Sequence, residues 1–269
     1  MNQGQGQIVL AVRGLTVRVR DGRQSIPVVH GLDFDLHAGE ILALVGESGC
    51  GKTKTAEAIM GLVTPDTGTV EAECIELGGR NLATLTEAQY RRLRGREISM
   101  VFQDSRGALD PVFTVGGQLV SVIRRHQGLS ASRARVTAAA MLQRAGFADC
   151  RAMLRRYPHE LSGGQCQRVG IAMAMACHPR VLIADEPTTA LDVTTQAQVL
   201  SQLTRLGSDS ETGILLITHD LGIVAHYCDR AIVMREGRAV EEATVDALFY
   251  QPREEYTRTL LAAAREGAV

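Results

Sequence analysis

A glycine-rich stretch directly after the short apolar run at residues 41–45 has the residue types and spacing of a phosphate-binding loop. It fits the pattern G-x-x-x-x-G-K-[ST] and reads Gly46, Glu47, Ser48, Gly49, Cys50, Gly51, Lys52, Thr53. Its glycines allow backbone angles that turn several N–H groups toward one phosphate, and the N-terminus of the helix predicted at residues 54–60 adds partial positive charge. We expect Lys52 to bridge the β- and γ-phosphates and Thr53 to bind Mg²⁺. The stretch predicts a site for a nucleoside triphosphate.

Two adjacent carboxylates, Asp185 and Glu186, follow a second apolar run at residues 181–184. A strand there would deliver both to the carboxyl edge of a sheet, where open α/β sheets bind ligands. Asp185 is expected to hold Mg²⁺ through its water shell, and Glu186 to polarise the attacking water as a general base. Pro187 would then end the strand. The carboxylates and the glycine-rich stretch together predict nucleotide hydrolysis.

Several elements must position these residues. Alternating apolar residues at 8–19 and 28–36, separated by Asp21-Gly22, predict antiparallel strands. Short apolar runs predict strands buried in a parallel sheet, at residues 41–45, 181–184 and 214–217. Residues 130–155 carry spaced apolar residues among many arginines and predict a helical segment. The order indicates an α/β core with a helical subdomain set into it.

Composition excludes several classes of protein. The chain has 269 residues, of which 45% are hydrophobic, enough to bury the core of one or two packed domains. The 29 basic residues nearly balance the 30 acidic ones, which gives no indication of nucleic-acid binding. No apolar run is long enough to span a membrane, and the polar N-terminus does not resemble a secretory signal, so we expect the chain to stay in the cytoplasm. The six cysteines are scattered singly, which favours free thiols over a metal site.

The sequence Leu161-Ser162-Gly163-Gly164-Gln165 matches the signature sequence of ABC ATPases, and the chain resembles that family over nearly its whole length. The resemblance implies a P-loop NTPase of α/β class with an antiparallel β subdomain and an inserted helical subdomain. It also implies that the signature completes the nucleotide site of a partner subunit. The residues expected to do so are Ser162, Gly163, Gly164 and Gln165.

The same resemblance assigns three further roles. Gln103, after a strand at residues 98–102, would contact Mg²⁺ and the water and sense the permease. His219, after the strand at 214–217, would contact the γ-phosphate. Asp192, in a sequence similar to the family's D-loop, would help to link the two nucleotide sites. The expected catalytic residues are Glu186, His219 and Gln103, and the expected Mg²⁺ ligands are Thr53, Gln103 and Asp185.

The domain boundaries also follow from the resemblance. Residues 1–250 are expected to form the ATPase domain, with the helical subdomain at about residues 105–165 within it. Residues 251–269 resemble the C-terminal extension of peptide and nickel importer ATPases. The segments that carry this narrower resemblance are Phe102-Gln103-Asp104, Leu109-Asp110-Pro111, Tyr157-Pro158-His159-Glu160, Leu248-Phe249-Tyr250-Gln251-Pro252 and Tyr256-Thr257-Arg258.

The predicted function is therefore that of the ATP-hydrolysing subunit of an ABC importer at the cytoplasmic face of the cell membrane. Its expected partners are a second ATPase subunit, identical or different, two membrane permeases and an extracytoplasmic substrate-binding protein. The chain ends at Val269 without the cysteine cluster that many relatives carry, and in this it resembles the nickel or metal-chelate branch. A di- or oligopeptide cargo stays open as an alternative. The alternatives are a non-transport ABC ATPase of translation or DNA repair and a P-loop kinase, which would not require the signature.

The adenine contact departs from the family pattern. Related ATPases place an aromatic residue in the first strand region, where this chain has Val19 and no aromatic residue precedes Phe34. A valine offers apolar contact without ring stacking, although Arg18 or Arg20 could place a guanidinium over the base instead. We therefore expect weak discrimination between ATP and GTP.

Overall fold

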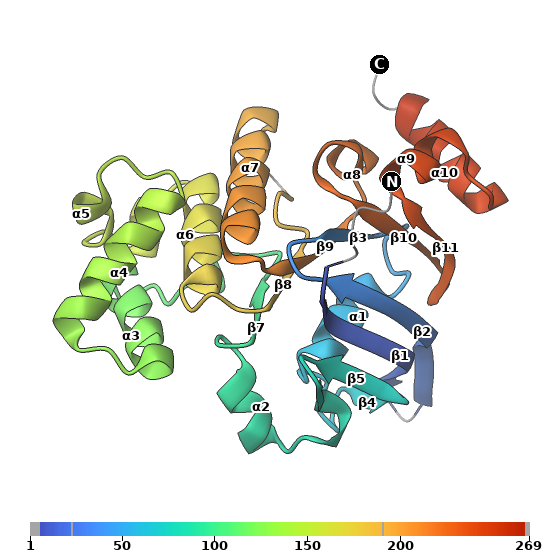
Figure 1. Cartoon of the computed structure of the whole chain (residues 1–269), viewed down its shortest axis with the longest axis horizontal. Coiled ribbons are helices and arrows are strands. Elements are labelled where there is room, and N and C mark those ends of the chain that lie inside the picture. Colours follow the sequence, from blue (N-terminus) through green and yellow to red (C-terminus); the bar gives the residue numbers. More distant parts are fainter. Residues whose placement is uncertain (1–5, 23, 190, 267–269) are drawn as a thin grey trace. The chain divides into compact units, whose positions relative to one another are not determined.

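The computed structural model describes residues 6–22, 24–189 and 191–266 (Figure 1). By internal contacts the chain divides into a first unit, residues 1–91 with 213–269, and a second unit, residues 92–212. The first unit contains the phosphate loop, a name used below for residues 46–53. The second contains the carboxylate pair and the signature sequence.

An antiparallel sheet opens the first unit. Its long strands β1 (Ile8–Asp21) and β2 (Gln24–His37) pair along their length, which confirms the antiparallel strands predicted from the alternating pattern. The sheet is completed by β4 (Gly68–Glu71), β5 (Cys74–Leu77) and β6 (Arg80–Asn81). A 3₁₀ turn at Leu82–Thr84 and helix α2 (Glu87–Leu93) follow. Because buried residues recur along β1 and β2 between half-buried or exposed ones, one face of the sheet can pack against the core.

Parallel strands form the centre of the first unit. Strand β3 (Ile41–Val45) lies between β9 (Gly213–Thr218) and β10 (Arg230–Arg235), parallel to both, and β11 (Arg238–Thr244) adds an antiparallel edge. All residues of β3 and β9 are buried, as expected for strands covered on both faces. Helices α1 (Lys52–Ile59) and α8 (Leu221–Tyr227) follow β3 and β9.

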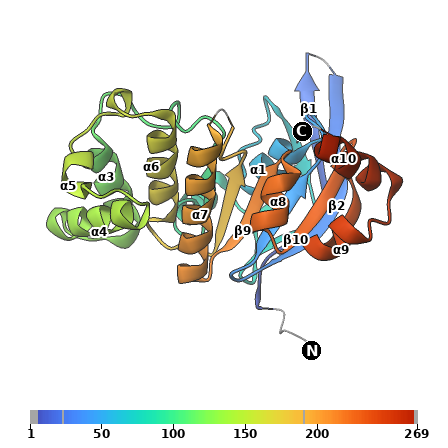
Figure 2. The same ribbon diagram turned by 90° about the horizontal axis from the view of Figure 1, so that it is seen from above.

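The C-terminal part of the chain packs on this centre (Figure 2). Helices α9 (Val245–Tyr250) and α10 (Glu255–Glu266) contribute Leu248 and Leu261 to an apolar cluster with Ala43 and Val45 of β3. Residues 251–266 of the expected tail thus lie within the first unit.

The second unit combines a strand pair with helices. Strand β7 (Ile98–Val101) pairs in parallel with β8 (Val181–Asp185), and both are buried. The helices are α3 (Val115–Gln127), α4 (Ala131–Arg144), α5 (Cys150–Met153), α6 (Gly163–Met175) and α7 (Val193–Ser210), with a 3₁₀ turn at Pro158–Glu160. The helical segment predicted at residues 130–155 corresponds to α4 and α5. Of the helices described, none has the length and apolar character needed to cross a membrane.

Candidate nucleotide-binding and hydrolysis site

The phosphate loop has the backbone that its glycines predict. Gly46, Gly49 and Gly51 have φ angles of 151°, 83° and 105°, which L-residues rarely adopt. A Cβ atom at Gly46 would lie 2.2 Å from the carbonyl oxygen of Met234, and one at Gly51 would lie 2.5 Å from that of Val28. The glycines are therefore required both by backbone conformation and by the close approach of β10 and β2.

Lys52 lies where an anion would need it. It is only 5% exposed, and its Nζ donates hydrogen bonds of 2.8 Å to the carbonyl oxygens of Gly46 and Glu47. Helix α1 begins at Lys52, and no side chain caps its N-terminus. Backbone N–H groups at a helix start together with a lysine ammonium form the donor set that binds phosphate. The loop therefore fits the phosphates of a nucleotide, with Thr53 in the first turn of the same helix.

His219 lies beside the phosphate loop in the sheet order. Val45 of β3 pairs with Thr218 of β9, so Gly46 and His219 are the first residues beyond neighbouring parallel strands. His219 is exposed, and the next residue, Asp220, caps α8 through its side chain. The strand ends therefore place His219 on the side of the sheet where the loop would hold phosphates, as its predicted role requires.

Val19 lies near the end of β1, half-buried, where it pairs with Ile26 of β2 and Gly68 of β4. Two residues earlier, Val17 pairs with Val29, whose Cγ2 atom would be 3.1 Å from a Cβ at Gly51. This part of the hairpin thus backs directly onto the phosphate loop. The base contact of Val19 remains a prediction.

Gln103 and Glu186 meet in the second unit. Val101 of β7 pairs with Ala184 of β8. Gln103 and Glu186 therefore come just beyond the ends of neighbouring parallel strands. The side-chain amide of Gln103 donates a 3.0 Å hydrogen bond to the carboxylate of Glu186. Asp185, the last residue of β8, is only 3% exposed. The structure therefore brings together three residues that the sequence placed in one site.

The carboxylate of Glu186 is also held from its own loop. Glu186 has a positive φ of 44°, which costs a non-glycine residue on the order of 1 kcal/mol. The hydroxyl of Thr189 donates a 2.8 Å hydrogen bond to the same Oε2 atom that accepts from Gln103. Two donors on one oxygen fix the orientation of the carboxylate. Sequence reasoning missed Thr189, although a hydroxyl three residues after a predicted base is a recognisable signal.

The signature residues begin a helix. Ser162 caps α6: its hydroxyl accepts from the backbone N–H of Gln165, while the Gln165 side chain accepts from the N–H of Ser162. This reciprocal capping fixes the first turn of α6. A Cβ at Gly163 would have ordinary contact at 3.7 Å with Leu191, whereas one at Gly164 would lie 2.2 Å from the Cγ2 of Thr195.

Gly164 therefore has a packing role that the sequence did not reveal, because it lets α6 approach α7. The expected contact of Ser162, Gly163, Gly164 and Gln165 with a partner's nucleotide remains a prediction. The exposed start of α6 is compatible with it, since helix N-termini attract phosphate.

Asp192 caps the next helix. Its carboxylate accepts hydrogen bonds of 3.0 Å from the backbone N–H and 2.7 Å from the hydroxyl of Thr195, at the start of α7. These hydrogen bonds hold the pKa of Asp192 below its ordinary value. Of the sequence similar to the D-loop, Ala190 lies outside the described residues. The link between the two nucleotide sites remains a prediction.

Two cysteines, one in the phosphate loop and one directly after the signature sequence, are free thiols. Cys50 and Cys166 are buried and unpaired, and burial raises the pKa of both. A raised pKa lowers the fraction of reactive thiolate. This supports the prediction of free cysteines without chemistry of their own.

Comparison with known proteins gives the class of the chain. The model of the ABC transporter family matches residues 29–189. The chain is 47% identical over 253 residues, 94% of its length, to the oligopeptide transport ATP-binding protein AppD of Bacillus subtilis (strain 168), and covers 77% of that relative. It is also 47% identical over 260 residues to the glutathione import ATP-binding protein GsiA of Escherichia coli (strain K12), of which it spans 42%.

Comparison with solved structures gives the same class. A post-hydrolysis dimer of the ATP-binding cassette MJ0796 bound to ADP and Pi superposes with a TM-score of 0.76 at 26% identity, covering 88% of this chain and 98% of that one. The structure of cbiO1 from Clostridium perfringens, part of the ABC transporter complex cbiONQ, gives a TM-score of 0.75 at 26% identity, covering 98% and 100%.

The fold and the site define a P-loop ATPase of the cassette type. The chain belongs to the ABC transporter family, in the group of peptide and nickel importer ATPases. It binds ATP with Mg²⁺ and hydrolyses ATP, which confirms the predicted fold class, enzyme class and cofactors.

Proposed function

We propose that the chain is the ATP-hydrolysing subunit of an importer that carries short peptides. The observation that carries the proposal is the 47% identity to an oligopeptide transport ATP-binding protein across 94% of this chain. The glutathione import relatives, named for a tripeptide, support the same class of cargo. These relatives favour peptide over the nickel or metal-chelate cargo that the sequence also allowed. They give no support to the translation and DNA-repair alternative.

Each residue of the site has a role in this proposal. The phosphate loop and Lys52 bind and orient the phosphates. Glu186, held by Gln103 and Thr189, accepts a proton from the attacking water. His219 donates toward the γ-phosphate. Bound Mg²⁺ neutralises charge on the phosphate oxygens, and Thr53, Asp185 and Gln103 are the residues that would hold it.

We propose that two ATPase subunits act together. Ser162 and the start of α6 form a second phosphate-binding helix N-terminus in a chain that already has the phosphate loop. In this proposal the signature serves the partner's nucleotide, as the dimeric MJ0796 relative suggests. The partner is a second copy or a different ATPase subunit. Co-purification of the active complex, followed by mass determination of its subunits, distinguishes the two.

The second unit offers a surface for a membrane permease. A groove of about 870 Å³ between α4 and α5 is lined by Ala131, Ser132, Arg135, Val136, Ala139, Arg151, Leu154 and Arg155. Val136, one of the apolar residues of this groove, is 72% exposed. The proposed docking surface comprises this groove and residues 103–115, where Val112 and Phe113 are 72% and 57% exposed.

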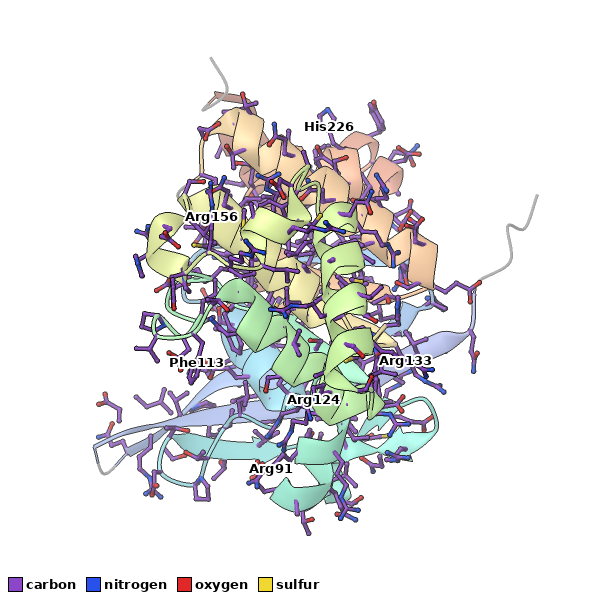
Figure 3. The ribbon with its side chains drawn as sticks, turned by 90° about the vertical axis from the view of Figure 1, so that its left-hand side faces the viewer. Arg91, Phe113, Arg124, Arg133, Arg156 and His226 are labelled. Carbon is purple, nitrogen blue, oxygen red and sulfur yellow. The ribbon has the colours of Figure 1, made fainter. Side chains whose placement is uncertain are left out.

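The charge of this surface indicates the chemistry of the segment that docks. Residues 115–156 contain eight arginines and a single acidic residue, whereas the whole chain has a net charge of −1. Figure 3 shows Arg124, Arg133 and Arg156 on the face that carries α3 and α4. Arg144 pairs with Asp209, while the other seven are exposed and form no ion pair within the described residues. An apolar groove with arginines around it fits an acidic, partly apolar segment.

The location follows from this partner. The proposal places the chain at the cytoplasmic face of the cell membrane, bound to two permeases and working with an extracytoplasmic substrate-binding protein. Charge reversal tests the surface: the triple variant Arg135→Glu, Arg151→Glu, Arg155→Glu is expected to separate from the co-expressed permease. Arg180→Glu, on the same unit but outside the groove, is the control. Retention of the triple variant would contradict the docking surface.

Uptake identifies the cargo. A strain lacking its own peptide importers would receive this chain with the permeases and binding protein encoded beside it, and would be offered labelled tripeptide, glutathione or ⁶³Ni²⁺. We expect peptide uptake that needs Lys52. Uptake of nickel alone would contradict the proposed cargo while leaving the ATPase assignment intact.

A further inference from the structure

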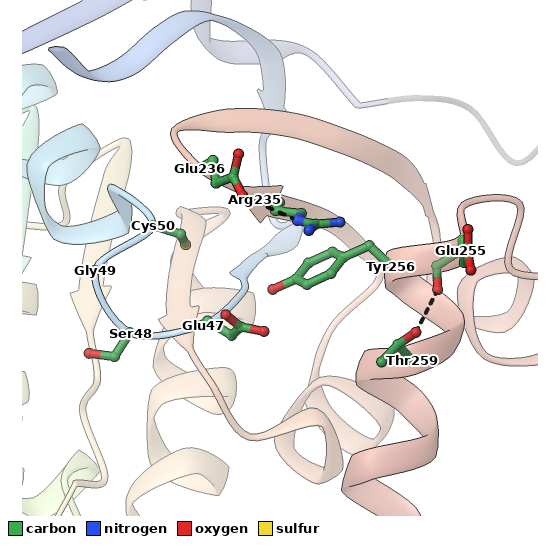
Figure 4. Close-up of a pocket in the computed structure, with 9 residues that line it drawn as sticks. All are labelled: Glu47, Ser48, Gly49, Cys50, Arg235, Glu236, Glu255, Tyr256 and Thr259. Carbon is green, nitrogen blue, oxygen red and sulfur yellow. Dashed lines mark hydrogen bonds and ion pairs between the residues drawn. The ribbon is translucent and has the colours of Figure 1, made fainter.

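A pocket lies beside the phosphate loop, on the side of helix α10 (Figure 4). Its volume is about 580 Å³, and all of its lining residues belong to the first unit. They are Glu47, Ser48, Gly49, Cys50, Arg235, Glu236, Glu255, Tyr256 and Thr259. The C-terminal helix therefore shares a pocket with the part of the loop that must fold around a phosphate.

Tyr256 is the side chain of α10 that reaches toward the loop. Figure 4 shows its ring extending from the helix, with the hydroxyl directed toward Glu47. The guanidinium carbon of Arg235 lies 4.9 Å from the ring centroid, close enough for a cation–π contact. The hydroxyl is shielded from solvent and lies beside Glu47, but among the described residues no hydrogen bond of normal geometry forms with it. Burial raises the pKa of Tyr256; the backbone of Glu47 acts against this shift, and the negative charge of the Glu47 side chain adds to it.

The base of α10 is anchored, so Tyr256 is held from behind. Glu241 of β11 is only 7% exposed and accepts hydrogen bonds of 2.9 Å and 3.1 Å from the backbone N–H groups of Arg253 and Glu254. The guanidinium of Arg258 donates a 2.6 Å hydrogen bond to the carbonyl oxygen of Arg253. Leu261, on one side of α10, is buried in the apolar cluster of the first unit. The position of the ring is thus fixed by the core.

The exposed side of the phosphate loop faces this pocket. Glu47, Ser48 and Gly49 are exposed. Beyond them, the N–H of Gly237 donates a 3.1 Å hydrogen bond to the carbonyl oxygen of Cys50, which supports the far end of the turn. On the Glu47 side, the pocket is lined by Arg235 at the end of β10 and by Tyr256 of α10. A loop that is held in its binding conformation loses less entropy when a ligand binds.

We propose that Tyr256 is a positioning residue for nucleotide binding: its ring, stacked with Arg235, supports the Glu47 side of the phosphate loop. The inference uses ATP binding and is independent of the cargo. It assigns the C-terminal helix a part in the ATP site, beyond packing on the core.

Steady-state hydrolysis by the assembled complex tests the role. Tyr256→Ala is expected to raise the KM for ATP about fivefold with kcat little changed, because it disturbs the free loop more than the chemical step. Tyr256→Phe keeps the stacked ring and is expected to retain the original KM. Tyr250→Ala is the control, since Tyr250 is 82% exposed on the same segment and outside the pocket.

Fluorescence shows whether position 256 senses the nucleotide in the phosphate loop. The chain contains no tryptophan, so Tyr256→Trp introduces a single reporter beside the loop. We expect a saturable emission change on addition of ATP, at concentrations that match binding, and no change for Tyr250→Trp. If Tyr256→Ala does not fold, Arg235→Met replaces it, with a smaller rise in KM expected.

Two results would overturn the proposal. One is a KM for ATP in Tyr256→Ala, or in Arg235→Met, that equals that of Tyr250→Ala. The other is a tryptophan at position 256 whose emission does not respond to ATP in a complex that hydrolyses ATP. If the original chain binds ATP normally but supports no peptide uptake, the proposed function is contradicted and the role of Tyr256 is not.

Discussion

The side-chain amide of Gln103 lies 3.0 Å from the Glu186 carboxylate, and the Thr189 hydroxyl lies 2.8 Å from the same oxygen. Gln103 and Glu186 are 83 positions apart in the sequence, yet neighbouring parallel strands bring them to one edge. A carboxylate fixed in this way can orient a water molecule without reorganising during the reaction. This contact links a residue expected to sense the permease with the residue expected to activate water.

The first prediction concerns Glu186. Glu186→Gln keeps the shape of the side chain but cannot accept the proton of the water, so kcat is expected to fall about 100-fold or more. ATP binding should persist, whereas Lys52→Ala should weaken binding itself. Equilibrium binding of ATP and single-turnover hydrolysis measure the two effects. Near-normal turnover by Glu186→Gln would point to another base, with His219 the first candidate.

The second prediction uses the two neighbouring glycines of the signature. Gly164→Ala places a Cβ 2.2 Å from Thr195 and should lower the free energy of unfolding by about 1–3 kcal/mol. Gly163→Ala meets only an ordinary contact at 3.7 Å and should be neutral or stabilise by up to about 1 kcal/mol. Urea unfolding of both variants measures the difference.

Adding Thr195→Ser to Gly164→Ala removes the clashing methyl group and keeps the hydroxyl that bonds Asp192. The double variant should recover most of the lost stability. Equal stability of the two single variants would show that α6 and α7 adjust to the extra methyl group.

The sequence predicted β1, β2, β3, β7, β8 and β9, the phosphate loop and the carboxylate pair, because their patterns depend on local spacing, whereas β4, β5, β6, β10 and β11 were not predicted. Val45 and Thr218 end neighbouring strands as parallel-sheet logic requires. The place of Tyr256 beside the phosphate loop could not be predicted in this way. Tyr256 reaches the loop only because Glu241 and the core fix α10 in space, and no local pattern records such a long-range contact.

The third prediction concerns the base. Because Val19 is an aliphatic residue on β1, phosphate contacts should dominate affinity and GTP should be hydrolysed within about tenfold of ATP, a gap of about 1.4 kcal/mol. Val19→Tyr should tighten nucleotide binding by adding a ring. The kcat/KM values for both nucleotides, with and without the substitution, test this. Strong rejection of GTP that does not respond to Val19→Tyr would assign the base to another residue.

The fourth prediction concerns acid stability. Burial acts to raise the pKa of Glu241, but the adjacent Thr257 hydroxyl and hydrogen bonds from the backbone N–H groups of Arg253 and Glu254 outweigh it and leave the pKa below its ordinary value of 4.5. The ionised carboxylate therefore stabilises the fold above pH 4.5, and this contribution is lost as pH falls through the lower folded-state pKa.

Glu241→Gln should lower the melting temperature at neutral pH. The difference in melting temperature between this variant and the original chain should become smaller as the pH falls below 4.5. Glu236→Gln is the control, because the Glu236 side chain is 83% exposed. A difference between Glu241→Gln and the original chain that is constant from pH 7 to about pH 3 would show that ionisation of Glu241 contributes nothing.

The most direct test of the account is ATP-driven uptake by the purified complex of this chain with its permeases and binding protein, reconstituted in vesicles with ATP on the side of the ATPase. The original chain is expected to move labelled oligopeptide across the membrane in proportion to the ATP hydrolysed. Glu186→Gln should bind ATP but neither hydrolyse it nor sustain uptake over many cycles. Sustained uptake with Glu186→Gln, or hydrolysis by the original complex without peptide movement, would contradict the account.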